Sequence, residues 1–117
     1  MTETELLYTI GVGLGGNIDQ ILELTTDDIV DESISLHVGP LHIRRTYLLP
    51  ADIKETLQSR SGKIFNLSRD DAMASLDILD FLPLTMQRYY DETGDIYYPM
   101  HIFGIEDEEH ALAVIGR

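Results

Sequence analysis

The chain has 117 residues, of which 44% are hydrophobic, and a formal net charge of -13 from 21 acidic and 8 basic residues. This length predicts a single domain over residues 1–117, with enough apolar residues for a buried core. The absence of Cys excludes disulfides, thiolate metal sites and a cysteine nucleophile. No apolar run reaches the length of a membrane-spanning helix, and the acidic start differs from a signal peptide, so we expect a cytoplasmic protein.

The strong negative charge has two explanations. It repels nucleic acid and anionic membranes and attracts basic surfaces, which favours a protein partner with a basic face. It also suits solubility in a saline cytoplasm. Asp outnumbers Glu and Arg outnumbers Lys, as in salt-adapted proteins, whereas the abundance of Ile does not fit an extreme halophile. Both explanations stay open.

The first 32 residues contain two apolar segments, separated by glycines, and then an acidic segment. Residues 6–14 predict a strand that runs into a glycine-rich bend at Gly15 and Gly16. Residues 17–24 predict either a short helix capped by Asn17 or a strand. Residues 25–32 are polar and acidic and predict a loop.

Residues 33–48 predict a β-hairpin. A two-residue turn at Gly39 and Pro40 sorts the side chains by period two into a nearly all-apolar face and a polar face. In this register His37 lies opposite His42, and Arg44 joins them on the polar face. Arg45 falls on the otherwise apolar face, where we expect an internal ion pair with a carboxylate such as Asp31 or Glu32, or an anion-binding role.

The remainder of the chain is mostly helical in pattern. Helices are predicted over 50–60, 69–82 and 83–93, the last between Pro83 and Gly94. Residues 96–105 predict a strand, and 111–115 either a returning strand or a short helix. The order of elements predicts an α+β fold, with a mainly antiparallel sheet and about three helices packed on one side.

A glycine-rich segment matches a nucleotide-binding pattern. Gly11, Gly13 and Gly16 fit G-x-G-x-x-G after the predicted strand, which makes a ligand site with Arg44 an alternative function. The close spacing of glycines equally fits tight packing. His37 and His42 are candidate metal ligands, although a third ligand is not evident from the sequence.

Two groups of acidic residues and two tyrosines are candidates for partner binding. Asp70, Asp77 and Asp80 fall on one side of the predicted 69–82 helix. The candidate binding residues are Asp70, Asp77, Asp80, Glu106, Asp107, Glu108, Glu109, Tyr90 and Tyr97. Carboxylates on a rigid element can imitate DNA phosphates or pair with Lys and Arg, and tyrosines serve as interface anchors.

The leading functional hypothesis is a non-enzymatic protein that occludes a basic surface of another protein. An inhibitor, an immunity or anti-defence protein, a chaperone or a nucleic-acid mimic has this size and charge. We expect no catalytic residues, no cofactor, no direct contact with nucleic acid and no membrane contact. The alternatives are a small-ligand or nucleotide-binding domain and a self-assembling structural subunit, and the apolar segment 96–103 is compatible with a homodimer.

Overall fold

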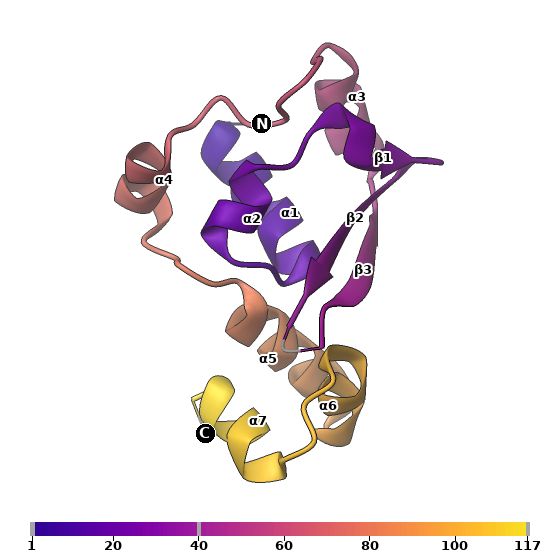
Figure 1. Ribbon diagram of the computed structural model, residues 1–117, viewed down its shortest axis with the longest axis vertical. Helices are drawn as coiled ribbons and strands as arrows, with labels where there is room; N and C mark the ends of the chain where they lie inside the picture. The colour runs from indigo at the N-terminus through magenta and orange to yellow at the C-terminus, as the bar shows by residue number, and fades with distance from the viewer. Residues whose placement is uncertain (1, 40, 117) are drawn as a thin grey trace.

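The computed structural model describes residues 2–39 and 41–116, and its elements combine helices with one small sheet (Figure 1). The helices are α1 (Glu3–Leu14), α2 (Ile18–Leu22), α3 (Ala51–Gln58), α4 (Arg69–Leu76), α5 (Leu82–Thr93), α6 (Tyr97–Phe103) and α7 (Glu108–Val114), with a 3-10 helix η1 (Thr26–Asp28). The strands β1 (Ile29–Val30), β2 (Ser33–Val38) and β3 (Ile43–Leu48) form an antiparallel sheet in the order β1-β2-β3. The predicted α+β class is confirmed, and the described residues form seven α-helices.

The segment predicted as the first strand is helix α1. Its apolar residues include Leu6, Leu7, Ile10 and Leu14, which lie on one buried side of a helix. Thr2 and Glu5 close a capping box at the N-terminus of α1, and Gly15 ends the helix in the left-handed conformation with φ 84°. The segment had been predicted as a strand that ends in a glycine-rich bend, and glycines within it lower the helix propensity of α1.

Two of these glycines are required by close packing. A Cβ on Gly11 would lie 2.7 Å from the ring of Phe81, and one on Gly13 would lie 2.5 Å from the ring of Tyr47. Both distances are shorter than any real contact, so an aromatic ring occupies the space that a side chain would take. Packing of the two rings against α1 explains Gly11 and Gly13, and a Cβ on Gly16 would lie 2.6 Å from a methyl group of Leu36.

The predicted hairpin is confirmed with its faces as expected, but its register differs by two residues. Val38 pairs with Ile43, Leu36 with Arg45 and His37 with Arg44. The turn therefore spans residues 39–42 and not two residues, and Pro40 lies outside the described residues. A shift by two keeps every side chain on its face, because strand side chains alternate with period two.

The C-terminal third differs most from the prediction. Helix α4 ends at Leu76, where Asp77 takes a left-handed conformation with φ 53°, so no single helix covers 69–82. Residues 97–103, predicted as a strand, form α6, and Pro99 fits there because it lies in the first turn, where no backbone donor is needed. Of the two alternatives for 111–115, the helix is confirmed, within α7.

The buried residues form two hydrophobic clusters. The larger cluster brings together α1, α2, α3, α4 and the sheet, and includes Ile34, Phe65 and Phe81. The smaller cluster comprises Val38, Met86, Ile96, Met100, Phe103, Ile105, Ala111 and Ile115. Helices α6 and α7, yellow in Figure 1, lie at the opposite end of the molecule from α3. The inner face of the sheet contributes to both clusters, with Leu36 packing against each.

Candidate functional site

A polar cleft lies beside the turn of the hairpin. It consists of two adjoining hollows of about 350 and 310 Å³ that share Gln20 and His42. The residues lining this hairpin cleft are Gly15, Asn17, Gln20, Glu23, Leu24, Asp28, Leu36, His37, Gly39, His42, Asp80 and Leu82. Imidazoles, amides and carboxylates therefore converge from α2, the hairpin and the link between α4 and α5.

Short-range and long-range hydrogen bonds fix the walls of the cleft. Asn17 and Gln20 form a reciprocal capping box at the N-terminus of α2, with N···O distances of 2.9 and 3.1 Å. The free amide nitrogen of Gln20 donates to the carbonyl oxygen of His37 at 3.1 Å and ties α2 to β2. Asn17 also forms an antiparallel bridge with Asp80. The cleft is thus a fixed feature of the fold.

The outer face of the sheet adjoins the cleft. It carries Val30, Ser33, Ser35, His37, Arg44, Thr46 and Leu48, which the register places on one side. Val30 and Leu48 flank Ser33 at one end, the hydroxyls of Ser35 and Thr46 lie 3.1 Å apart in the middle, and His37 lies opposite Arg44 at the other end. This outer sheet face therefore changes from apolar to cationic towards the cleft.

Arg44 is one of few cations in the described residues that lack a carboxylate partner. Four others form ion pairs within 4.0 Å, namely Lys54 with Glu32, Arg60 with Glu3, Arg69 with Asp19 and Arg88 with Glu92. Arg44 is exposed and donates one hydrogen bond, to the Ser35 hydroxyl at 3.3 Å. Lys63, near the opposite end of the sheet, has no carboxylate within that distance among the described residues either. Arg44 is the described arginine that is available for an external anion.

Arg45 does not form the expected ion pair with Asp31 or Glu32. Its guanidinium donates to the carbonyl oxygens of Gly13 and Leu14, both at 3.4 Å, and to the Tyr89 hydroxyl at 2.6 Å. It also lies 5.3 Å from the ring centre of Tyr89 and 5.1 Å from that of Phe103. A cation at the C-terminal end of α1 compensates the helix dipole. Arg45 thus connects α1, α5 and α6 and is not an anion site.

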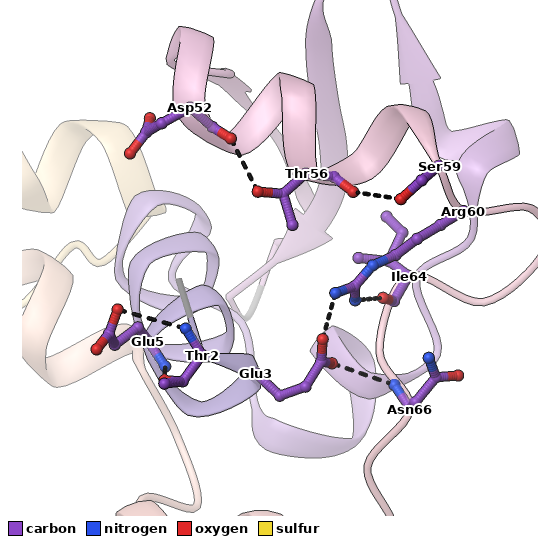
Figure 2. Close-up of polar contacts among 9 residues, drawn as sticks. All are labelled: Thr2, Glu3, Glu5, Asp52, Thr56, Ser59, Arg60, Ile64 and Asn66. Carbon is purple, nitrogen blue, oxygen red and sulfur yellow. Dashed lines mark hydrogen bonds and ion pairs between the residues drawn. The ribbon is translucent and has the colours of Figure 1, made fainter.

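A further hollow of about 330 Å³ lies beneath α3. Ile29, Leu49 and Leu57 form its apolar part, and Lys54 and Arg60 line it. Both cations are engaged: Lys54 pairs with Glu32, and Arg60 binds Glu3 and the carbonyl oxygen of Ile64 (Figure 2). The hydrogen bond from Arg60 lowers the pKa of the Glu3 carboxyl below its usual 4.5. This hollow offers no free charged group.

The acidic candidates do not form one surface. Asp70 lies in the first turn of α4, Asp77 caps its end, and Asp80 accepts a hydrogen bond from the Leu82 amide at 3.0 Å. The predicted common helix face is therefore wrong, because α4 ends before Asp77. Asp80 is the member of this group that enters the hairpin cleft.

The second acidic group lies at the far end of the molecule, around the start of α7. Glu106 and Asp107 precede the helix, and Asp107 caps it by accepting from the Glu109 amide at 3.2 Å. Glu108 accepts a hydrogen bond from the Tyr97 hydroxyl at 2.9 Å, and this bond raises the pKa of Tyr97 above 10.0. Tyr97 is exposed and Tyr90 is half-buried. These residues do not reach the hairpin cleft.

The glycine motif and Arg44 are not brought together. Gly11 and Gly16 are buried, and Gly13 faces the ring of Tyr47, whereas Arg44 lies on the outer sheet face. His37 and His42 are not cross-strand partners, but both line the hairpin cleft. Within residues 2–39 and 41–116, no group of three or more His, Asp or Glu side chains is arranged to hold a metal ion.

Sequence reasoning did not identify the amide wall of the cleft. Asn17 had been recognised as a helix cap, and Gln20 three residues later completes the capping-box signature that marks this helix start. Asp80 had been assigned to a helix, because the residues that follow α4 continue its apolar spacing. No local signal indicates that the α4–α5 link returns to Asn17.

Comparisons with known proteins give a fold relationship. Neither a protein-family model nor a curated protein sequence matches the chain. Among solved structures, the fold is similar to the catalytic domain of bacteriophage HP1 integrase, with a TM-score of 0.66 and 14% sequence identity. The similarity covers 94% of this chain and 72% of that chain. The folds therefore correspond along almost the whole of this chain. The described residues contain no helix that is long and apolar enough to span a membrane.

This similarity corrects the function that we inferred from charge and size. A non-enzymatic inhibitor, immunity protein, chaperone or nucleic-acid mimic was predicted, with ligand binding or self-assembly as alternatives. The fold is instead similar to that of an integrase catalytic domain, over 94% of the chain. The predicted partner, a protein with a basic face, and the predicted absence of direct nucleic-acid contact are contradicted on the same ground. Net charge describes the average surface, and it did not indicate which residues face a ligand.

Proposed function

We propose that this chain is an integrase-type domain that binds DNA through the outer sheet face, at the end where Arg44 lies opposite His37. The observation that carries the proposal is the fold similarity to an integrase catalytic domain over 94% of the chain. An integrase acts on DNA, and the side chains of the outer sheet face indicate where this chain contacts it. A cytoplasmic location, where the DNA of a prokaryotic or viral system is accessible, belongs to the same proposal.

The groups at this end of the sheet suit a phosphate backbone. Most protein–DNA hydrogen bonds go to phosphate and sugar and come from Arg, Lys, Ser, Thr and backbone amides. Arg44 supplies an unpaired guanidinium, and the Ser35 and Thr46 hydroxyls lie next to it on an exposed strand pair. The described residues of this face include no Phe, Tyr or Trp ring on which bases would stack. This composition favours duplex DNA over single strands and the backbone over base edges.

The negative charge of the molecule limits the strength of this contact. Charges farther apart than about 8 Å are largely screened at physiological ionic strength, so the cations at the contact decide the local attraction. One guanidinium contact corresponds to a slope of about -0.9 in the plot of log affinity against log salt. We therefore expect weak binding at low ionic strength, with a small salt dependence, in the absence of another DNA-binding segment.

The hairpin cleft does not have the groups for strand transfer. Phosphoryl transfer requires a nucleophile and cationic groups that stabilise the charge on the phosphate. The described residues that line the cleft include no Ser, Thr or Tyr and no Lys or Arg. We propose that the hairpin cleft is not a site of DNA cleavage. A supercoiled-plasmid nicking assay tests this part, and relaxation of the plasmid that is lost in the His37→Gln, His42→Gln variant would contradict it.

Binding is tested by fluorescence anisotropy with a short labelled DNA duplex, in a salt series from about 50 to 200 mM. We expect Arg44→Glu to weaken binding about tenfold or more, since it replaces the phosphate contact by a repelling charge. Lys63→Glu changes the net charge equally at the opposite end of the sheet and is expected to change binding less than about twofold. No binding by the unmodified chain, or equal losses in both variants, would overturn the proposal.

A further inference from the structure

The four histidines of the chain divide into two pairs by position. His37 and His42 are exposed on the hairpin and line the same hollow of the cleft. His101 and His110 are exposed on α6 and α7. Histidine is the side chain that ordinarily gains a positive charge between pH 8 and pH 5. A fall in pH therefore adds charge at two separate places, of which one adjoins Arg44.

The hairpin pair is held in place by the surrounding backbone. His37 lies opposite Arg44 in the strand register, and its carbonyl oxygen accepts from the Gln20 amide at 3.1 Å. His42 has a positive φ of 51°, and its amide donates to the carbonyl oxygen of Gly39 at 3.2 Å. Arg44, His37 and His42 thus lie at one end of the hairpin, where hydrogen bonds fix the backbone of both histidines, which reduces the ordering needed on binding.

Carboxylates from the neighbouring elements face the same pair. Glu23 at the end of α2 and Asp28 in η1 line the hollow that holds both imidazoles, and Asp80 from the α4–α5 link lines the hollow next to His42. With neutral imidazoles, these three carboxylates and the Arg44 guanidinium have a formal charge of -2. Protonation of both histidines brings the group to neutrality and adds N–H donors that bind phosphate oxygens strongly.

We propose that His37 and His42, once protonated, bind phosphates of the DNA beside Arg44, so that DNA binding is switched on by a fall in pH. This inference rests on the proposed function and specifies its regulation. At pH 8 the carboxylates of the cleft repel a phosphate backbone, and Arg44 alone attracts it. At about pH 5.5 the imidazolium groups offset that repulsion, while Asp and Glu of ordinary acidity stay ionised.

The switch has two measurable consequences. Two additional phosphate contacts steepen the slope of log affinity against log salt by about 1.8, and at about 50 mM salt they strengthen binding roughly 100-fold. Binding that requires protonated imidazoles also takes up protons. Isothermal titration in buffers of different ionisation enthalpy measures that uptake directly.

The chain supplies its own matched control. The double variant His37→Gln, His42→Gln removes the hairpin pair, and His101→Gln, His110→Gln removes the same number of titrating groups at the other end. All four side chains are exposed, so neither variant disturbs the buried clusters. Anisotropy with the same duplex is recorded for the unmodified chain and both variants at pH 8, pH 6.5 and pH 5.5.

We expect the unmodified chain and the His101, His110 variant to gain affinity as the pH falls, and the His37, His42 variant to keep its pH 8 affinity throughout. An equal gain in all three proteins overturns the switch but leaves the proposed function standing. If both double variants fail equally to gain affinity as the pH falls, the switch is also overturned, because the pH dependence then comes from overall charge. Absence of binding at every pH rejects the proposed function itself.

Discussion

The two hydrophobic clusters differ in how they are built. In the larger cluster, helices α1 to α4 pack on one face of the sheet, and aromatic rings fit against glycine backbone, as Phe81 does on Gly11. The smaller cluster has three helices, α5 to α7, closed against Val38 at the end of the sheet. Its Phe103 ring lies against Gly15, the residue that ends α1, where a Cβ would meet the ring at 3.1 Å. The larger cluster depends on contacts distant in sequence, whereas seven of the eight buried residues of the smaller one lie within residues 86–115.

Arg45 is a polar connection between the two clusters, in addition to the apolar contact of Leu36 with both. It comes from the inner face of the sheet, binds the last carbonyls of α1 in the larger cluster, and lies against Tyr89 and Phe103 on the side of the smaller one. A polar side chain at this position couples the clusters through directed hydrogen bonds. We therefore expect that changes in the larger cluster affect the whole fold and that changes in the smaller one stay local.

The largest expected effect is that of Phe81→Ala. The ring is fully buried, and its loss leaves a cavity beside Gly11, which costs about 3 to 5 kcal/mol of unfolding free energy. Phe103→Ala removes an equally buried ring from the smaller cluster and is expected to cost less and to act locally. Urea unfolding measures the free energies, and amide hydrogen exchange shows which helices open. Equal decreases in the free energy of unfolding, with faster exchange throughout the chain in both variants, would contradict the distinction between the clusters.

Arg45→Met is expected to have an intermediate effect. It leaves the Tyr89 hydroxyl and two carbonyl oxygens of α1 without their donor, at a cost of about 1 to 3 kcal/mol. Hydrogen exchange should accelerate in α6 and α7 more than in α1 if Arg45 couples the clusters. Arg44→Met is the control, since this side chain is exposed, and it should change stability by less than about 0.5 kcal/mol. Uniform acceleration throughout the chain would argue against a coupling role.

The smallest expected effect is a pH dependence of the free energy of unfolding, caused by the ion pair of Glu3 and Arg60 beside the larger cluster. Arg60 lowers the pKa of Glu3 in the folded state, so this pair stabilises the fold above the unfolded value of 4.5. The stabilisation is lost as the pH falls through the lower folded-state pKa. Because the pair is partly exposed, it contributes at most about 1 kcal/mol. Urea unfolding is measured at about pH 6 and pH 3, with Glu55→Gln as the control. The free energy of unfolding should decrease less between these pH values in Glu3→Gln than in Glu55→Gln. An equal decrease in the free energy of unfolding in both variants would exclude the Glu3–Arg60 pair as the cause of the pH dependence.

The sequence predicted the elements in which one periodicity dominates. The hairpin faces were correct because alternation with period two is insensitive to a shift by two residues, and α5 lies between Pro83 and Gly94 as expected. The strands predicted at 6–14 and 96–105 were wrong. Gly11 and Gly13 concealed α1, and Pro99 suggested an edge strand although a helix accepts proline in its first turn.

The candidate site was less predictable than the fold class. His37, His42 and Arg44 were assigned to one polar face, and the structure places the two histidines in one cleft. The opposite wall of that cleft was not predictable, because Asp80 reaches Asn17 only through tertiary packing. Net charge was misleading about the partner, since most described cations are already paired and the few that remain free decide what the surface attracts.

The bridge between Asn17 and Asp80 has a consequence for synthesis of the chain. The Phe81 amide donates to the carbonyl oxygen of Gly16 at 2.9 Å, and the Ile18 amide donates to that of Leu79 at 2.8 Å, so the turn after α1 is completed by residues made about sixty positions later. At roughly 5 to 20 residues per second, a ribosome needs several seconds to deliver them. During that time the nascent chain exposes the apolar side of α1, including the backbone at Gly11 that the Phe81 ring covers in the folded protein. The N-terminal half is therefore a substrate for chaperones until Phe81 has been synthesised.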